Sequence, residues 1–181
     1  MSFYNLASMD WNGDLVNFPD KKGRLSGFFI WNEGDGKFLQ YTKPRGQTQG
    51  AFTIDKLRKA DYLPINMGIP VFSERAKRVF ERNIPGKMSF FECIIECEGV
   101  EFLFYLSKVN EYVNIIDEDK SLFRTLTDGS KIIRKPFIRY LDGFFIVRDE
   151  TYCTYLVVSQ KFVDMCINEN IVIDFLKYQF C

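Results

Sequence analysis

The clearest hydrophobic pattern in the chain follows Ser73, where Ala76, Val79 and Phe80 recur at the spacing of one helical face. A serine just before the first turn can accept a hydrogen bond from a free backbone N–H group. Pro85 ends the pattern, because proline lacks an N–H group and disfavours helix in the residue before it. The chain is therefore predicted to form a short amphipathic helix that starts at Ser73.

A second run of the same design follows Ser159. Its apolar positions are again three and four residues apart, and they are Phe162, Val163, Cys166 and Ile167. We expect these four side chains on one buried face, with Ser159 as the cap. The two helices bracket a region rich in predicted strands, and two copies are too few for a repeat architecture.

Residues 88–97 and 100–107 both resemble strands, and Glu98-Gly99 lies between them. Two such runs joined by a short glycine-containing connection predict a β-hairpin. One face is expected to carry Phe91, Cys93, Ile95 and Cys97, and the other Glu92, Ile94, Glu96 and Glu98. With Glu101 following, the second face is acidic. A row of carboxylates can solvate a surface strand and discourage edge pairing, or it can bind a cationic partner.

Glycine, proline and asparagine turn signals divide the rest of the chain. The elements expected between them are strands over residues 25–32 and 37–41 that form a hairpin around a glycine turn, a helix over residues 55–62, strands over residues 131–140 and 144–148 on either side of residues 141–143, and a final strand over residues 152–158. Together these elements predict an α+β fold with a mostly antiparallel sheet and a few short helices.

The length and composition are those of a folded globular domain. A chain of 181 residues that is 46% hydrophobic and 17% aromatic can bury a core without disulfides. We expect a single compact domain over residues 1–181. Within it, residues 1–64 form an aromatic, turn-rich N-terminal part, and residues 65–181 form the remainder.

Charge and hydropathy argue against a polyanion or a membrane as the partner. The chain has 24 basic and 24 acidic residues, so its net charge is zero. A basic loop over residues 43–50 is the best case for nucleic-acid binding, supported by Lys131, Arg134, Lys135 and Arg139. No apolar run has transmembrane length, and the N-terminus lacks a signal-peptide pattern. The sequence predicts a cytoplasmic protein that binds neither nucleic acid nor membrane.

The cysteines are odd in number and have no disulfide-framework spacing: they are Cys93, Cys97, Cys153, Cys166 and Cys181. Cys93 and Cys97 share a predicted strand face and could form a metal or redox pair. Free cysteine is, however, more often a small buried hydrophobe. We therefore expect reduced, buried thiols.

The chain contains no histidine, which limits its catalytic chemistry. Ser-His-Asp and Cys-His nucleophiles and His-ligated zinc are excluded, and glycine-rich nucleotide-binding motifs are also missing. Asp117, Glu118 and Asp119 are consecutive, so their side chains cannot all converge on one cation. Carboxylate and cysteine chemistry remain open, and no cofactor is expected.

Three successive segments resemble a known family. They are residues 69–75 (IPVFSER), residues 112–121 (YVNIIDEDKS) and residues 157–162 (VVSQKF). This order, over about residues 65–178, is similar to that of the bacterial polymorphic-toxin immunity proteins. The resemblance implies a small cytoplasmic protein that binds a cognate toxin, the C-terminal domain of a secreted effector, and blocks it without catalysis.

The resemblance supplies no site residues, so candidates come from the predicted surface. High-affinity interfaces depend on a few anchors inside a polar rim. The candidates are the acidic strand residues Glu92, Glu96, Glu98 and Glu101, the turn residues Asp117, Glu118 and Asp119, and the N-terminal aromatics Tyr4, Trp11 and Trp31. The acidic strand residues come first, because carboxylates facing a basic toxin would speed association. Two alternatives stay open: an enzyme that reverses toxin damage, and an adaptor with an unrelated partner.

Overall fold

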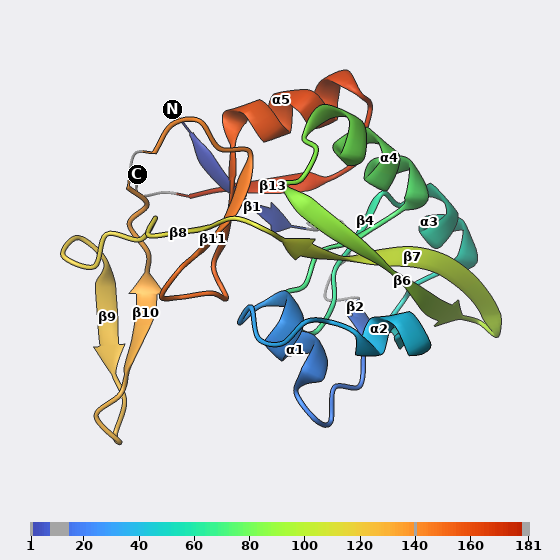
Figure 1. Cartoon of the computed structure of the whole chain (residues 1–181), viewed down its shortest axis with the longest axis horizontal. Helices are drawn as coiled ribbons and strands as arrows, with labels where there is room; N and C mark the ends of the chain where they lie inside the picture. The colour runs from blue at the N-terminus through green and yellow to red at the C-terminus, as the bar shows by residue number, and fades with distance from the viewer. Residues whose placement is uncertain (1, 8–14, 140, 179–181) are drawn as a thin grey trace.

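The computed structural model describes residues 2–7, 15–139 and 141–178 (Figure 1). Its helices are α1 (Arg24–Phe29), α2 (Phe38–Tyr41), α3 (Ile54–Lys59), α4 (Glu74–Asn83) and α5 (Gln160–Asn168). Its strands are β1 (Phe3–Ala7), β2 (Leu15–Asn17), β3 (Arg45–Gln49), β4 (Tyr62–Leu63), β5 (Val71–Phe72), β6 (Met88–Cys97), β7 (Val100–Val109), β8 (Tyr112–Val113), β9 (Leu122–Thr125), β10 (Lys131–Lys135), β11 (Ile146–Asp149), β12 (Leu156–Ser159) and β13 (Asp174–Lys177). Short helices and largely antiparallel sheets confirm the predicted α+β class.

The larger sheet has the strand order β2-β3-β6-β7-β5-β4. Its longest strands, β6 and β7, form the predicted hairpin and pair along their whole length. Glu98 (φ 52°) and Gly99 (φ 78°) adopt left-handed conformations at the turn, which suit the twist of a two-residue connection. β3 runs parallel to β6, so the N-terminal part supplies a neighbouring strand of this hairpin.

The smaller sheet has the strand order β13-β1-β12-β11-β8. β1 pairs antiparallel with both β12 and β13, so the N-terminal strand lies between two strands from the C-terminal end. β8 pairs with β11 in parallel. Strands from residues 1–64 therefore take part in both sheets.

Helix α4 begins as predicted. The N–H group of Ala76 donates a hydrogen bond to Ser73 Oγ at 3.1 Å, and Ala76, Val79 and Phe80 are buried. The Phe80 ring packs against Phe162 of α5, with ring centres 5.2 Å apart. The two helices therefore share one core.

Helix α5 is present, but two details of its prediction are wrong. Ile167 is 65% exposed, while Phe162, Val163 and Cys166 are buried. The hydroxyl of Ser159 makes no capping bond; it is buried and donates to the carbonyl oxygen of Phe144 at 2.8 Å. The nine-residue helix thus buries a narrower face than its sequence suggests.

The predicted N-terminal hairpin is wrong, because residues 25–32 and 37–41 contain the helices α1 and α2. Leu25, Phe28 and Phe29 are buried at helical spacing. The rings of Phe28 and Phe29 meet Phe91 of β6 edge to face, with ring centres 5.3 and 5.5 Å apart. A short apolar run fits either a helix or a strand, so packing on the sheet decides the conformation.

The other elements are predicted correctly in part. The helix expected over residues 55–62 is α3. The strands expected over residues 131–140 and 144–148 are present as β10 and β11, but they do not pair with each other. β10 pairs with β9, and β11 pairs with β12 and β8. β12 leads into α5 as predicted but is not the final strand, because β13 follows.

Three clusters of buried side chains form the core. The first fills the space between α1 and one face of the larger sheet, and the second joins α4 and α5 to both sheets. The third covers the other face of the smaller sheet. In Figure 1, α4 and α5 lie above the larger sheet, and α1 and α2 lie below it. None of the helices in the described ranges has the length and apolarity needed to cross a membrane.

Candidate functional site

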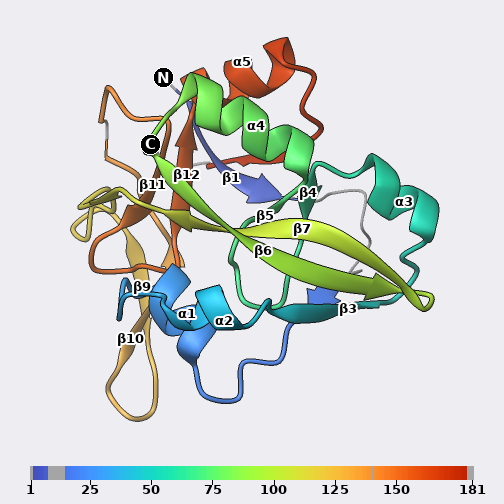
Figure 2. The same cartoon turned by 45° about the vertical axis from the view of Figure 1, so that its right-hand side comes forward.

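One side of the larger sheet is left uncovered over β3, β6 and β7. α1 covers the other side, and α4 covers only one end of this side, where Lys77 Nζ lies 5.3 Å from the ring centre of Tyr105. Figure 2 shows β3, β6 and β7 side by side, with α4 above and α1 and α2 below. We call the uncovered part the open face; its residues are Arg45, Gln47, Glu92, Ile94, Glu96, Glu101 and Leu103.

Strand register explains why these side chains share one face. Ile94 lies opposite Leu103, Glu96 lies opposite Glu101, and Arg45 lies beside Ile94. Directly paired residues point to the same side of a sheet. Leu103 is 44% exposed. Together with Ile94 it forms an apolar centre on the open face, with charged side chains around it. Such a centre with a polar rim is typical of protein–protein interfaces.

Ion pairs neutralise half of the predicted acidic set. They join Lys43 to Glu92 at 2.5 Å, and Arg45 to Glu101. Glu96 and Glu98 form no ion pair with a residue in the described ranges. Two carboxylates directly opposite each other destabilise a sheet, and Glu96 lies opposite Glu101. The ion pair of Arg45 with Glu101 offsets this repulsion. The remaining negative charge is concentrated at the turn of the hairpin.

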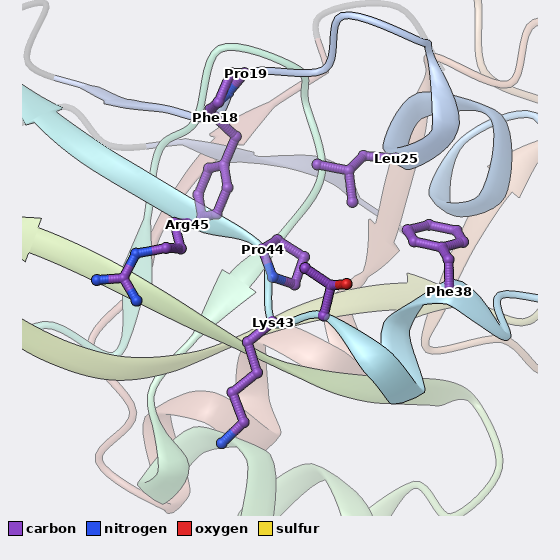
Figure 3. A pocket seen from close by; sticks show the side chains of 8 residues that line it. Phe18, Pro19, Leu25, Phe38, Lys43, Pro44 and Arg45 are labelled. Atoms are coloured by element: carbon purple, nitrogen blue, oxygen red, sulfur yellow. The ribbon is translucent and has the colours of Figure 1, made fainter.

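An apolar hollow of about 290 Å³ adjoins the open face (Figure 3). It is lined by Phe18, Pro19, Leu25, Phe38, Thr42, Lys43, Pro44 and Arg45. In Figure 3 the rings of Phe18 and Phe38 lie on either side of Pro44, and the charged ends of Lys43 and Arg45 extend away from the apolar centre. These two cations are the ones that pair with the open face, so the hollow and the open face share a border.

Gly46 allows the wall of this hollow to form. A Cβ atom at this position would lie 2.7 Å from the ring of Phe18 and 2.8 Å from Val16 Cγ1. Phe18 is fully buried, so it has no room to move aside. The glycine therefore brings β3 and the Phe18 ring into close contact.

The predicted acidic turn lies elsewhere, between β8 and β9. Asp117 is engaged within the turn: its Oδ1 accepts from the N–H group of Lys120 at 3.3 Å, and its Oδ2 lies 3.6 Å from Lys120 Nζ. Glu118 accepts from the Tyr152 hydroxyl at 3.0 Å, and Asp119 is exposed. The described residues contain no group of three or more His, Cys, Asp or Glu side chains placed to hold a metal ion.

Trp31 is separate from both acidic regions. It is 47% exposed and lies two residues after the end of α1, which packs on the covered side of the larger sheet. Its neighbour Ile30 accepts a hydrogen bond from the Tyr112 hydroxyl at 3.1 Å, which fixes this segment. Trp11 lies outside the described residues. The structure thus brings together Glu92, Glu96, Glu98 and Glu101 but not the other candidates.

The predicted basic loop is not a loop, because most of residues 43–50 form β3. Its two cations pair with carboxylates of the open face. The other basic residues of that prediction lie on or after β10, outside the larger sheet. The basic residues that the sequence grouped together therefore lie on or next to two different sheets and do not form one surface.

The expectation of buried, reduced cysteines is confirmed for the part of the chain that the structure describes. Cys93, Cys97, Cys153 and Cys166 are free and buried. Burial raises the pKa of the Cys93 thiol to about 12. These thiols are therefore core residues, and Cys181 lies outside the described residues.

Two buried charged residues at the end of β11 were not predicted. Arg148 is fully buried, and its guanidinium donates to the carbonyl oxygens of Cys153 (2.8 Å) and Gly68 (3.0 Å). Asp149 accepts four backbone N–H bonds, of which those from Ile115 and Ile116 are 3.0 and 2.9 Å long. The only sequence signal is that Arg148 and Asp149 directly follow an apolar run.

The comparison with known families is consistent with the resemblance noted in the sequence. A family model described as an immunity protein family (Imm11) matches residues 24–171. This range includes α1, β3 and the hairpin of the open face, so it extends well into the N-terminal part. No curated protein matches the chain. The match covers most of the sequence, and the chain therefore belongs to the Imm11 immunity protein family.

Proposed function

We propose that this protein binds a cognate toxin in the cytoplasm and neutralises it by direct contact, without catalysis. The expected partner is the C-terminal toxin domain of a secreted effector encoded beside it. Membership of an immunity protein family supports this role. The main observation in favour of a binding surface is the open face, where Glu96 and Glu101 border Ile94 and Leu103 and Glu98 lies in the adjoining turn.

The open face has the chemistry expected of an inhibitor's binding surface. Its apolar centre can be desolvated by a partner, and the adjoining hollow is large enough for one anchoring side chain. The carboxylates of Glu96 and Glu98 would attract a basic toxin surface and speed its association. Because Glu92 and Glu101 already have cationic partners, Glu96 and Glu98 carry most of this attraction.

The first test is co-expression in bacteria with the toxin domain of the adjacent large gene product. Survival together with co-purification of the two proteins would support neutralisation by binding. Survival without a complex would favour the alternative of an enzyme that reverses toxin damage. Loss of protection would instead favour an adaptor with an unrelated partner.

Charge reversal at the hairpin turn tests the surface itself. In the double variant Glu96→Lys/Glu98→Lys, we expect association with the toxin domain to slow by about tenfold at low ionic strength, because steering charges act mainly on the association rate. The control is Glu150→Lys/Asp164→Lys, which changes the net charge equally at two exposed positions outside the open face. Equal association rates for the two variants would remove the open face from consideration.

Trp31 and Glu118 remain second candidates. Truncation of the exposed Trp31 to alanine would remove an aromatic anchor of the kind enriched in interface hot spots. The same binding assay, applied to Trp31→Ala and to Glu118→Gln, would show whether the toxin also contacts the α1 side or the acidic turn.

A further inference from the structure

The β9–β10 hairpin projects from the body of the protein in both views (Figures 1 and 2). Its two strands pair with each other and with no further strand of the described chain. An isolated two-stranded hairpin is at best marginally stable in water, so contacts at its base must hold it.

The inner face of the hairpin supplies those contacts. The Phe123 ring packs against Tyr152 with ring centres 6.2 Å apart, and the Tyr155 hydroxyl donates to the carbonyl oxygen of Ile133 at 3.3 Å. At the base, Ser121 Oγ accepts from the N–H group of Phe137 at 2.9 Å. The hairpin is therefore positioned before any partner arrives, which lowers the entropy lost on binding.

The outer face carries aliphatic side chains that the fold does not use. Alternation along β9 and the register with β10 place Leu122, Arg124, Leu126 and Ile132 on the side away from Phe123 and Ile133. Leu122 is 55% exposed, Ile132 46% and Leu126 37%. Clustered exposed aliphatics mark an interaction site, whereas single ones do not.

The hairpin is also strongly basic in a chain with no net charge. Residues 122–135 contain Arg124, Lys131, Arg134 and Lys135 against a single acidic residue, Asp128, whose carboxylate is bonded to Ser130. A groove of about 630 Å³ at the hairpin base is bordered by Arg134, Lys135 and Lys177. The cationic surface thus continues from the arm onto the edge strand β13.

We infer that this hairpin is a second toxin-binding arm, which docks its aliphatic and basic outer face into an acidic groove of the toxin. The inference rests on the proposed function and deepens it. The open face offers carboxylates to a basic surface, whereas the arm offers arginines and aliphatics to an acidic one. Arginine is enriched at interface hot spots, and the buried centre of an interface is apolar.

The test uses the full-length protein and the toxin domain of the adjacent gene product. In Arg124→Glu/Arg134→Glu, which reverses two exposed charges on the side of Ile132, we expect association to slow by about tenfold at low salt and the difference to shrink as salt is added. In Ile132→Ser, we expect dissociation to accelerate by about tenfold. Circular dichroism and thermal unfolding should match the wild type, because all three side chains are exposed.

The control is Lys21→Glu/Lys22→Glu, which reverses two exposed charges before α1. If both hairpin variants bound and released the toxin domain at the wild-type rates, the hairpin would not be a toxin-binding arm, and the proposed function would still stand. Failure of the wild-type chain to bind the toxin domain would overturn both proposals. Binding of a labelled single-stranded DNA oligonucleotide that is lost in Arg124→Glu/Arg134→Glu would assign the arm to nucleic acid instead.

Discussion

Cys93 and Cys166 lie in different hydrophobic clusters, one below the larger sheet and one between α4 and α5. Burial raises the pKa of each thiol from 9.0 to about 12, because the thiolate would lose its hydration. The thiolate is the reactive form of cysteine. Both residues should therefore behave as inert apolar side chains in the folded protein.

This inertness can be measured by thiol labelling. In a Cys181→Ser variant at about pH 8, we expect Cys93 and Cys166 to react with a disulfide reagent only after unfolding, as followed by mass spectrometry. Since folding raises both pKa values, the stability due to these protonated thiols is complete below pH 9 and is lost between pH 9 and about 12. Rapid labelling of Cys93 in the native protein would contradict this assignment.

At the scale of the element, Ser73 has two roles at the start of α4. Its hydroxyl oxygen accepts from the N–H group of Ala76, and its proton is donated to Asp61 Oδ1 at 2.8 Å. Asp61 is almost fully buried and also accepts from Arg75 and from the N–H group of Val172. The helix start is thus joined through Asp61 to the segment after α5.

Substitutions at Ser73 separate these roles. We expect Ser73→Ala to lower the free energy of unfolding by about 1–2 kcal/mol and Ser73→Thr to restore most of it, measured by urea denaturation. Ser73→Asp would suit an isolated helix cap, but here it places a second carboxylate beside Asp61 and should also destabilise the protein. Wild-type stability in Ser73→Asp would show that the bond to Asp61 contributes little.

At the scale of the whole molecule, Arg148 connects the two sheets. It lies on β11 of the smaller sheet, and its guanidinium reaches the carbonyl oxygen of Gly68 in the segment before β5 of the larger sheet. Burial lowers the pKa of Arg148, because the guanidinium loses its hydration. No carboxylate of the described residues lies within ion-pair distance of it. Hydrogen bonds to two carbonyl groups stabilise the charge instead.

Replacement of Arg148 tests this connection. Arg148→Ala leaves a cavity and two unpaired carbonyl groups, so we expect a loss of about 3–5 kcal/mol in the free energy of unfolding. Arg148→Met fills most of the volume without a buried charge and should be clearly more stable than Arg148→Ala. If both variants lost the same free energy of unfolding in urea denaturation, the hydrogen bonds of Arg148 to the two carbonyl groups would contribute more stability than the desolvation of its charge costs.

Prediction from the sequence succeeded where one local pattern was long enough. The ten-residue strands of the β6–β7 hairpin alternate over many positions, and α4 has a capping serine and a regular apolar face. The acidic face of the hairpin could be predicted for the same reason. Prediction failed for α1 and α2, which are short. The ring of Phe28 in α1 packs against Phe91 of β6 and against Phe38 of α2, and neither contact is encoded in a local pattern.

The sequence by itself determined the α+β class, the hairpin with one apolar and one acidic face, the buried thiols and the resemblance to immunity proteins, because each rests on residues close together in the chain or on composition. Only the tertiary structure decided which carboxylates are neutralised, where Arg148 is buried and which side of the sheet stays open. Those features depend on contacts such as Arg45 with Glu101 and Arg148 with Gly68. These partners are far apart in sequence, and no local periodicity encodes their pairing.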